Sequence, residues 1–347
     1  METIQPQTKR YLFKIFILLM ILGQLNVEGN TTFESNSICE SGVIKRGPYL
    51  SLDTTTQLNN EIKVRWRTDE EESFSFCFKE ITASNYTCQT ITGTTTTIAI
   101  PYDFLGNLTT CDVIDYEATV PISSQNTYNY EIRCLNGLVL KIGEINPYPT
   151  NTTEAPLNIW ITGDGGYAHG LNLVEEAYSR YLGDVNLDGL IDDKDISKKS
   201  DFILMLGDNA YAEQAQFDDD LCNTVIVPCP TSDCRSDGGD FAYQKAIFDQ
   251  QGEIFKNNIM WTTIGNHEVD YKMFDRNYHE FAEIFPYLPE NKGYYSFDYG
   301  KVHFVCLNSE IGNSFFSETA IEMKNWLVED LTASKETAEW TIVYFHH

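Results

Sequence analysis

Residues 202–211 read Phe-Ile-Leu-Met-Leu-Gly-Asp-Asn-Ala-Tyr, an unbroken apolar run followed at once by a glycine and polar side chains. A short continuous apolar run is typical of a strand buried on both faces of an α/β sheet. The runs 157–162, 259–264 and 341–345 predict three further strands of this kind, each also followed by polar residues. Because sites in open α/β sheets form at the carboxyl ends of the strands, we expect the four polar islands to meet at one edge.

The four islands supply the ligand types of a two-metal site. They are Gly163-Asp164-Gly165-Gly166, Gly207-Asp208-Asn209-Ala210-Tyr211, Gly265-Asn266-His267-Glu268 and Val343-Tyr344-Phe345-His346. Carboxylate, amide, phenol and imidazole ligands without thiolates suit iron, zinc or manganese. Asp208 is the predicted bridge, because one carboxylate can hold two cations about 3.5 to 4 Å apart, the spacing that clamps a phosphoryl group. Tyr211 indicates a ferric ion, because a phenol with a pKa of about 10 binds as phenolate only beside a strong Lewis acid.

The order and spacing of the islands resemble those of the purple acid phosphatases of the metallophosphoesterase superfamily, whose motifs are GDxG, GDxxY, GNH(E/D), VxxH and GHxH. The chain contains the first four in that order. The resemblance implies a calcineurin-like α/β domain over residues 155–347, with Asp164, Asp208 and Tyr211 on Fe(III) and with Asp208, Asn266 and His346 on a divalent Fe, Zn or Mn ion. The fifth motif is not found before the sequence stops at His347, so the expected domain is incomplete, as in a truncated copy or a partial gene model.

The same resemblance implies an acid phosphatase that hydrolyses phosphate monoesters with a metal-bound hydroxide. His267 is not needed as a ligand and is the predicted catalytic residue, protonating the leaving oxygen or stabilising the phosphoryl charge, with Glu268 orienting it. His347 should point away from His346 on a strand, which disfavours a substrate contact. Tyr211 could instead be an ordinary pocket aromatic, so a metallophosphodiesterase, a nucleotide pyrophosphatase and an inactive truncated fragment remain as alternatives.

The first half of the chain predicts an all-β sandwich over residues 40–148. Apolar and polar residues alternate in Lys63-Val64-Arg65-Trp66-Arg67, and Asn136-Gly137 is a strong signal for a type I′ hairpin turn. The phrase 46–50 (RGPYL) followed by 64–68 (VRWRT) resembles the fibronectin-III-like domain that precedes many plant-type and bacterial purple acid phosphatases. We expect this domain to act as a spacer, joined through a Pro- and Thr-rich linker at residues 147–156.

Two insertions are expected in the second half. Residues 184–195 match a Ca²⁺-binding loop of the dockerin type, with a solvated acidic turn as the alternative. Its predicted oxygen ligands are Asp184, Asn186, Asp188, Asp192 and Asp195. Residues 212–239 carry three cysteines and an acidic run, which predict a mobile flap tied by disulfides near the site.

The N-terminus predicts entry into the secretory route. Residues 1–28 combine basic residues with a short apolar run, 15–22, as in a signal peptide too short to be a membrane anchor. Four sequons predict glycosylation at Asn30, Asn85, Asn107 and Asn151. Nine cysteines favour disulfides in such a compartment, with Cys306 expected to be a buried free thiol because it lies in an apolar strand. The predicted location is therefore extracellular or a lysosomal or vacuolar lumen.

The charge balance is strongly acidic. With 51 Asp and Glu against 24 Lys and Arg, the formal net charge is −27. Such a surface repels nucleic acid, so the expected partner is a small phosphate ester held by the metals and not by a basic patch. The natural ester, the divalent metal, the disulfide pairing and the oligomeric state are left open by the sequence.

Overall fold

The computed structural model describes residues 39, 43–52, 61–100, 109–121, 123–152, 156–166, 177, 200–211, 240–268, 279–286, 292–311 and 318–347. Residues 39–347 form one compact unit. The expected signal peptide, the calcium loop 184–195, the insertion 212–239 and the sequons at Asn30 and Asn107 lie outside the described residues.

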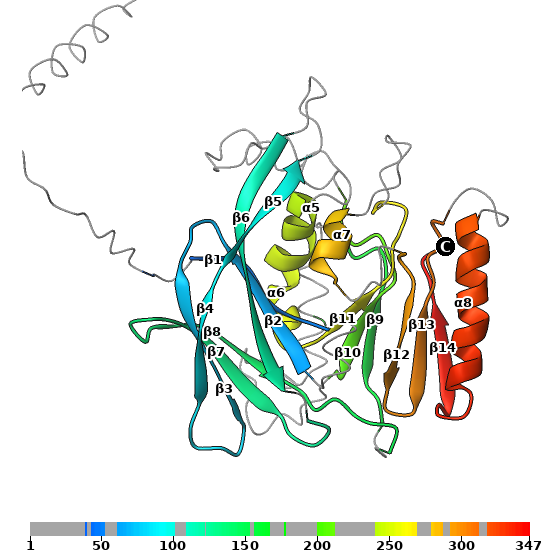
Figure 1. Cartoon of the computed structure of the whole chain (residues 1–347), viewed down its shortest axis with the longest axis horizontal. Helices are drawn as coiled ribbons and strands as arrows, with labels where there is room; N and C mark the ends of the chain where they lie inside the picture. Colours follow the sequence, from blue (N-terminus) through cyan, green and yellow to red (C-terminus); the bar gives the residue numbers. More distant parts are fainter. Residues whose placement is uncertain are drawn as a thin grey trace, which may run out of the picture. The chain divides into compact units, whose positions relative to one another are not determined.

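The first half of this unit is an antiparallel β-sandwich, as the alternating sequence predicts (Figure 1). Its interior contains an aromatic stack in which the ring of Trp66 lies 6.1 Å from that of Phe76 and 5.3 Å from that of Tyr116. One sheet has the order β1 (Ile44–Ser51), β2 (Glu61–Thr68), β6 (Thr109–Pro121) and β5 (Thr94–Ile100), and the other has β4 (Thr87–Thr92), β3 (Ser73–Glu80), β7 (Tyr128–Cys134) and β8 (Val139–Ile145).

The hairpin between β7 and β8 lies where Asn136-Gly137 predicted it, but the turn type differs. The N–H of Gly137 donates to the carbonyl of Cys134, and the N–H of Cys134 donates to the carbonyl of Leu138. Gly137 has a φ of 92°, whereas Asn136 is not among the described non-glycine residues with positive φ. A type I′ turn needs positive φ at both central residues, so the prediction was wrong. The bonds and the Gly137 conformation fit a three-residue loop that ends in a left-handed glycine.

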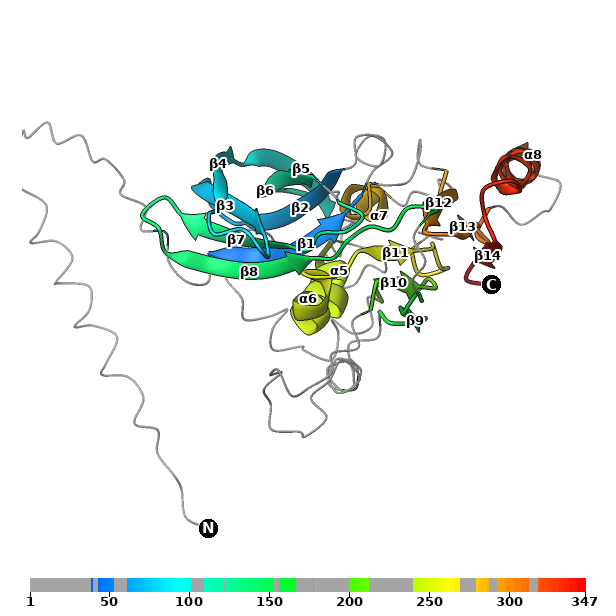
Figure 2. The same ribbon diagram turned by 90° about the horizontal axis from the view of Figure 1, so that it is seen from below.

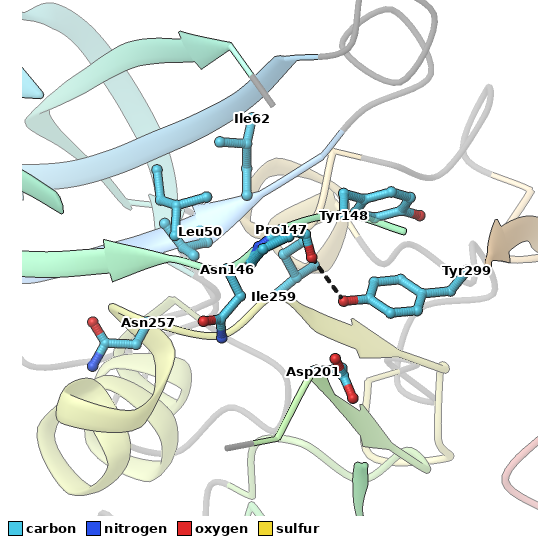
Figure 3. Close-up of a pocket in the computed structure, with 10 residues that line it drawn as sticks. Leu50, Ile62, Asn146, Pro147, Tyr148, Asp201, Asn257, Ile259 and Tyr299 are labelled. Atoms are coloured by element: carbon cyan, nitrogen blue, oxygen red, sulfur yellow. Dashed lines mark hydrogen bonds between the residues drawn. The ribbon is translucent and has the colours of Figure 1, made fainter. Parts of the chain in front are cut away.

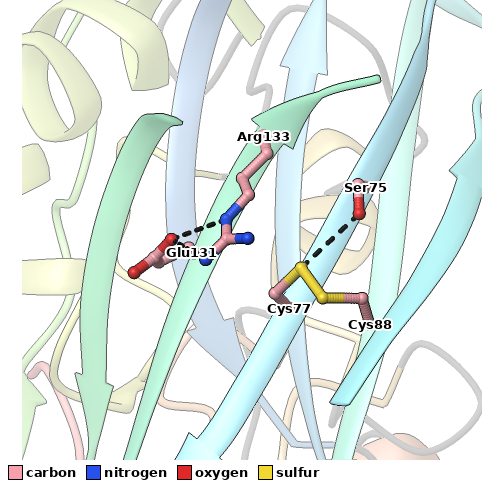
Figure 4. Close-up of a disulfide and its surroundings, with 5 residues drawn as sticks. All are labelled: Ser75, Cys77, Cys88, Glu131 and Arg133. Carbon is pink, nitrogen blue, oxygen red and sulfur yellow. Dashed lines mark hydrogen bonds and ion pairs between the residues drawn. A yellow bond between two sulfur atoms is a disulfide. The ribbon is translucent and has the colours of Figure 1, made fainter. Parts of the chain in front are cut away.

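Two disulfides support the prediction of an oxidising compartment. Cys39 is bonded to Cys134, and Cys77 of β3 is bonded to Cys88, its direct partner on β4 (Figure 4). Cys306 is free and buried, as its apolar strand predicted, and burial raises the pKa of its thiol to about 12. A buried thiol with a raised pKa is inert, so Cys306 acts as core packing.

The second half contains two further sheets and the predicted parallel strands. The first sheet has the order β11 (Met260–Thr262), β10 (Phe202–Met205) and β9 (Ile159–Thr162), and all of its pairs are parallel. The second has the order β12 (Tyr295–Tyr299), β13 (Val302–Cys306) and β14 (Trp340–Tyr344), with β13 and β14 parallel. The helical segments are α5 (Asp240–Tyr243), the π-helix η2 (Gln244–Phe248), α6 (Asp249–Phe255), α7 (His279–Ile284) and α8 (Glu318–Ser334).

An aromatic layer joins these two sheets face to face. The Trp261 ring of β11 stacks on Phe297 of β12 at 3.8 Å, and Phe202 of β10 meets Phe304 of β13 edge-on at 5.2 Å. Aromatic pairs of this kind add about 0.5 to 1.5 kcal/mol each beyond the area they bury. The layer therefore fixes the sheet of β14 against the sheet of β9 to β11. Helix α8, seen end-on in Figure 2, is bonded to this second sheet through Asp330.

The sandwich and the second half share one hydrophobic core, and their junction is polar as well as apolar. Arg46 of β1 and Arg67 of β2 both donate to the Asp240 carboxylate at the start of α5, at 2.8 Å. Both halves also line a small pocket, where the Tyr299 hydroxyl donates to the carbonyl of Pro147 at 3.4 Å (Figure 3). The sandwich is thus held against the second half by buried contacts and is more than a spacer.

Candidate metal centre

The four predicted islands converge, because each follows the carboxyl end of its strand. Asp164 follows β9, Asp208 follows β10, Asn266 follows β11 and His346 follows β14. The ligand atoms of Asp164, Asp208 and His346 all lie within 4.8 Å of one another, which makes these three a group able to hold a metal ion. Residues more than 180 positions apart in the chain meet here because the sheet of β14 packs against the sheet of β9 to β11.

Asp208 lies at the centre of the group and is 3% exposed. Its Oδ1 lies 3.4 Å from Nε2 of His346 and accepts the backbone N–H of His267 at 3.0 Å. Its Oδ2 accepts the Tyr211 hydroxyl at 2.7 Å. The two carboxylate oxygens therefore face opposite sides of the cluster, which is the arrangement needed for a ligand that bridges two ions.

The backbone around the two aspartates adopts a conformation that few side chains tolerate. Asp164 and Asp208 have φ values of 52° and 53°, and they are the two non-glycine residues with positive φ in the described part of the chain. Left-handed conformations of this kind cost roughly 1 to 3 kcal/mol and concentrate at functional sites. A bond from the Asp164 N–H to the Gly207 carbonyl (3.1 Å) and one from the Gly166 N–H to the Asp208 carbonyl (2.9 Å) hold the two loops together.

Two glycines are needed for the close approach of these loops. A Cβ on Gly207, which has a φ of 85°, would lie 2.6 Å from Nδ1 of His346. A Cβ on Gly265 would clash with the backbone and carboxylate of Asp208. Both sites require glycine because the ligands pack directly onto its Cα.

His346 is oriented by the backbone. Its Nδ1 lies 2.6 Å from the carbonyl oxygen of Leu206, so this nitrogen carries the proton and donates. The other nitrogen, Nε2, then presents its lone pair toward the cluster, 3.2 Å from Oδ1 of Asn266. A backbone carbonyl that fixes the tautomer is the usual support of a metal-binding histidine.

Tyr211 and His267 lie together over the aspartates. The Tyr211 hydroxyl donates to Asp164 at 3.1 Å and to Asp208 at 2.7 Å. Burial, then the bond to Asp208, raises the pKa of this phenol. Its ring centroid lies 4.2 Å from that of His267, and Nε2 of His267 lies 4.0 Å from Oδ2 of Asp208. The side chain of His267 is 29% exposed, so it borders the cluster on the solvent side.

Glu268 is placed differently from the role we predicted for it. Both of its carboxylate oxygens accept backbone N–H groups of the metal-binding loops, two to each oxygen. Burial raises the pKa of the Glu268 carboxyl, while the N–H groups of Gly265, Asn209 and Ala210 lower it. Because both oxygens accept two N–H bonds each, the group is held as a carboxylate. Because all four of these bonds go to backbone N–H groups, Glu268 supports the loops after β10 and β11 and does not orient His267.

Sequence reasoning missed a fifth island at the same edge. Asn308, Ser309 and Glu310 follow β13, which runs parallel to β14, and the signal was the apolar run of β13 ending in polar residues. Nδ1 of His347 lies 3.2 Å from Oε1 of Glu310, and its backbone N–H donates to Oγ of Ser309. The ring of His347 also lies 4.1 Å from that of His346, so this island borders the cluster. The prediction that the two rings point apart was wrong, because β14 ends at Tyr344 and the alternation of a strand does not reach them.

Comparison with known proteins agrees with this geometry. The family model of the calcineurin-like phosphoesterases matches residues 157–347, more than half of the chain. The chain belongs to the calcineurin-like phosphoesterase family. No curated protein sequence gives a significant match.

A solved structure gives the same fold for the larger part of the chain. It is a purple acid phosphatase isolated from seeds of yellow lupin, Lupinus luteus, with 15% sequence identity and a TM-score of 0.51. The match covers 85% of this chain and 50% of the lupin chain, so the chain spans about half the length of that protein. The resemblance to purple acid phosphatases that the motifs predicted is confirmed at the level of the fold.

Proposed function

We propose that this phosphoesterase is a metal-dependent acid phosphatase acting on phosphate monoesters. The observation that supports the proposal is the meeting of five predicted ligands at the carboxyl ends of strands from two packed sheets. They are Asp164, Asp208, Tyr211, Asn266 and His346. The proposal extends the family membership to a branch and a substrate class, and it rests on the ligand types together with the fold of the lupin enzyme.

The residues fit a pair of unlike ions. Asp164 and Tyr211 lie on one side of Asp208, and His346 and Asn266 lie on the other. The phenol and carboxylates suit Fe(III), and the imidazole and amide suit a divalent Fe, Zn or Mn ion. When bound, such ions supply an activated water at acidic pH and neutralise charge on the phosphoryl group.

The remaining roles belong to side chains of the chain itself. His267, beside Tyr211 and partly exposed, is the proposed acid for the leaving oxygen, because it borders the cluster on the side open to solvent.

The activity test compares substrates after metal loading. We expect the purified protein, loaded with iron and zinc or with manganese, to hydrolyse p-nitrophenyl phosphate faster at acidic than at neutral pH. Slower hydrolysis of bis-p-nitrophenyl phosphate and of the ATP pyrophosphate bond is expected under the same conditions. Preference for the diester or for ATP would favour the metallophosphodiesterase or nucleotide pyrophosphatase alternatives, and no hydrolysis in any metal would favour an inactive fragment.

We further propose that the protein enters the secretory route. Two of the predicted glycosylation sites, Asn85 and Asn151, are exposed, and the two disulfides suit an oxidising lumen. No helix among the described residues is long and apolar enough to cross a membrane. A mass shift on treatment with an N-glycosidase, smaller in Asn85→Gln and in Asn151→Gln than in the wild type, would test this part. The predicted calcium loop at 184–195 stays a separate prediction, checked by calcium binding to the purified protein.

A further inference from the structure

Glu268 is a buried carboxylate whose partners are all backbone, and its surroundings define a site for an anion. Its exposed fraction is 3%. Oε1 accepts the N–H groups of Asn209 (2.6 Å) and Ala210 (3.2 Å). Oε2 accepts those of Asp208 (3.0 Å) and Gly265 (2.7 Å). A carboxylate with both oxygens used twice is saturated as an acceptor.

Three of the four donors are consecutive in the chain. Successive N–H groups that converge where the backbone enters a left-handed turn form a nest, a concavity that binds anions. The turn here begins at Asp208, with a φ of 53°. The loop after β10 is therefore an anion-binding nest, and the side chain of Glu268, from the loop after β11, is the anion that fills it.

A second bond pair shows that the two loops are locked as a unit. The Asn209 side chain donates from Nδ2 to the carbonyl of Thr263 (3.0 Å) and accepts the Thr262 hydroxyl on Oδ1 (2.6 Å). Asn209 is fully buried, so its backbone cannot move without breaking these bonds. Residues 208–210 are thus held twice, through their N–H groups by Glu268 and through the Asn209 side chain by Thr262 and Thr263.

We infer that Glu268 is a positioning residue that keeps Asp208 in its bridging conformation by occupying this nest. The inference rests on the proposed function, because Asp208 matters only if the site binds metal. The sequence predicted that Glu268 orients His267. In the structure Glu268 instead binds the loop that carries Asp208. Loss of supports behind metal ligands typically lowers metal affinity by about 10- to 100-fold.

The substitution Glu268→Gln removes one of the two acceptor oxygens and turns an N–H₂ group toward two N–H donors. We expect it to weaken Mn²⁺ binding, measured by equilibrium dialysis with Mn²⁺ alone, by about 10- to 100-fold. Glu268→Asp keeps the charge but is one methylene shorter, so an intermediate loss is expected. The matched control is Glu131→Gln, the same change on a carboxylate of the sandwich that accepts from Arg133, which should leave Mn²⁺ affinity unchanged.

A cavity variant keeps the test valid if Glu268→Gln folds poorly. Glu268→Ala leaves the nest open to a free carboxylate, so excess acetate should restore Mn²⁺ affinity and thermal stability to Glu268→Ala. Acetate should change neither the Mn²⁺ affinity nor the thermal stability of the control variant Glu131→Ala. If acetate has no effect on Glu268→Ala, a carboxylate in the nest does not support Asp208 and the inference is wrong.

The outcomes separate the inference from the function. A wild type that binds no Mn²⁺ contradicts the proposed metal site and the inference with it. A wild type that binds Mn²⁺ beside a Glu268→Gln variant of equal affinity, or an acetate effect no larger in Glu268→Ala than in Glu131→Ala, overturns the inference alone.

Discussion

At the scale of single residues, the chemistry of the site depends on how much strain and desolvation Asp208 carries. It is buried, left-handed and bonded on both carboxylate oxygens. Its neighbour Asp164 has the same backbone conformation but is exposed to solvent. The two carboxylates are therefore not equivalent, because removing Asp208 disturbs both sides of the cluster while removing Asp164 disturbs one.

This difference predicts how many ions each variant loses. Asp208→Asn should release both ions, because the Asp208 carboxylate lies between Tyr211 and His346. Asp164→Asn should release one ion. Asparagine tolerates a left-handed backbone, so the comparison isolates the ligand charge. Elemental analysis of the purified variants gives the metal content. Two ions per chain retained in Asp208→Asn would rule out a bridging role.

Tyr211 distinguishes a ferric site from a pair of divalent ions. A phenolate on Fe(III) donates charge to the metal, so the iron-loaded wild type should show a visible purple or pink absorption band. Tyr211→Phe keeps the aromatic ring that packs against His267 but removes the hydroxyl oxygen. The absorption band should therefore disappear while the protein stays folded. Absorption spectra of both iron-loaded proteins are the measurement. An unchanged band in the variant would show that Tyr211 is a pocket aromatic and not a ligand.

For His267 the expected defect depends on the leaving group. His267→Ala should retain the metals and lower kcat by about 10²- to 10⁴-fold, the range for losing a general acid. Phosphate esters with good leaving groups need less protonation and should lose least. Steady-state rates on a series of aryl phosphates give the trend, with metal content as the control. Equal losses across the series would assign His267 to substrate positioning.

At the scale of elements, the sequence predicted well what depends on local order. Continuous apolar runs located β9, β10, β11 and β14 and the polar residues after them from the sequence alone. The prediction that all four strands are buried was wrong, because β10 and β11 are buried but β9 is half-buried and most of β14 is exposed. The Asn136-Gly137 turn was predicted in place but not in type, because register with the bulged strand decides which residues take positive φ. The Glu268 contacts could not be predicted, since they join loops whose spacing is set by the folded sheet.

The contact between sandwich and α5 was also beyond sequence reasoning, and it predicts a large stability effect. Asp240→Asn leaves Arg46, which is 2% exposed, without its countercharge, and leaves Arg67, which is 8% exposed, paired with Asp115 alone. Breaking a buried ion pair typically costs roughly 3 to 5 kcal/mol. The matched control is Asp69→Asn, whose exposed pair with Lys45 should contribute less than about 1 kcal/mol. Urea unfolding of both variants measures the difference, and equal midpoints would mean that the junction carries little stability.

At the scale of the whole molecule, two charge clusters in different places act on the pH range of stability. The first is Asp240 with its two arginines at the sandwich junction. The second is His303 of β13, whose ring nitrogens lie 2.7 Å from Asp298 of β12 and 2.8 Å from Asp330 of α8. The hydroxyl of Ser296 also donates to Asp330. The first cluster ties the halves together, and the second ties α8 to its sheet.

The two clusters limit stability from opposite sides. Burial alone would raise the pKa of Asp240, but Arg46 and Arg67 lower it to about 2 from 3.8. Its contribution is therefore complete above pH 3.8 and is lost as the pH falls through 2. The bonds to Asp298 and then Asp330 raise the pKa of His303 to about 9 from 6.5. Its contribution is complete below pH 6.5 and is lost as the pH rises through 9.

We therefore expect both clusters to contribute fully only between pH 3.8 and 6.5, the acidic range in which the proposed phosphatase would work. Melting temperatures of the metal-free wild type across pH should show this plateau, with a decline on the alkaline side. His303→Gln should remove the contribution of His303 to that decline, because glutamine keeps hydrogen bonding but does not titrate, and Asp240→Asn should leave the alkaline limb unchanged. If the melting temperature of His303→Gln falls as much at alkaline pH as that of the wild type, other groups cause the fall. The raised pKa of His303 would then not contribute to the stability of the whole protein.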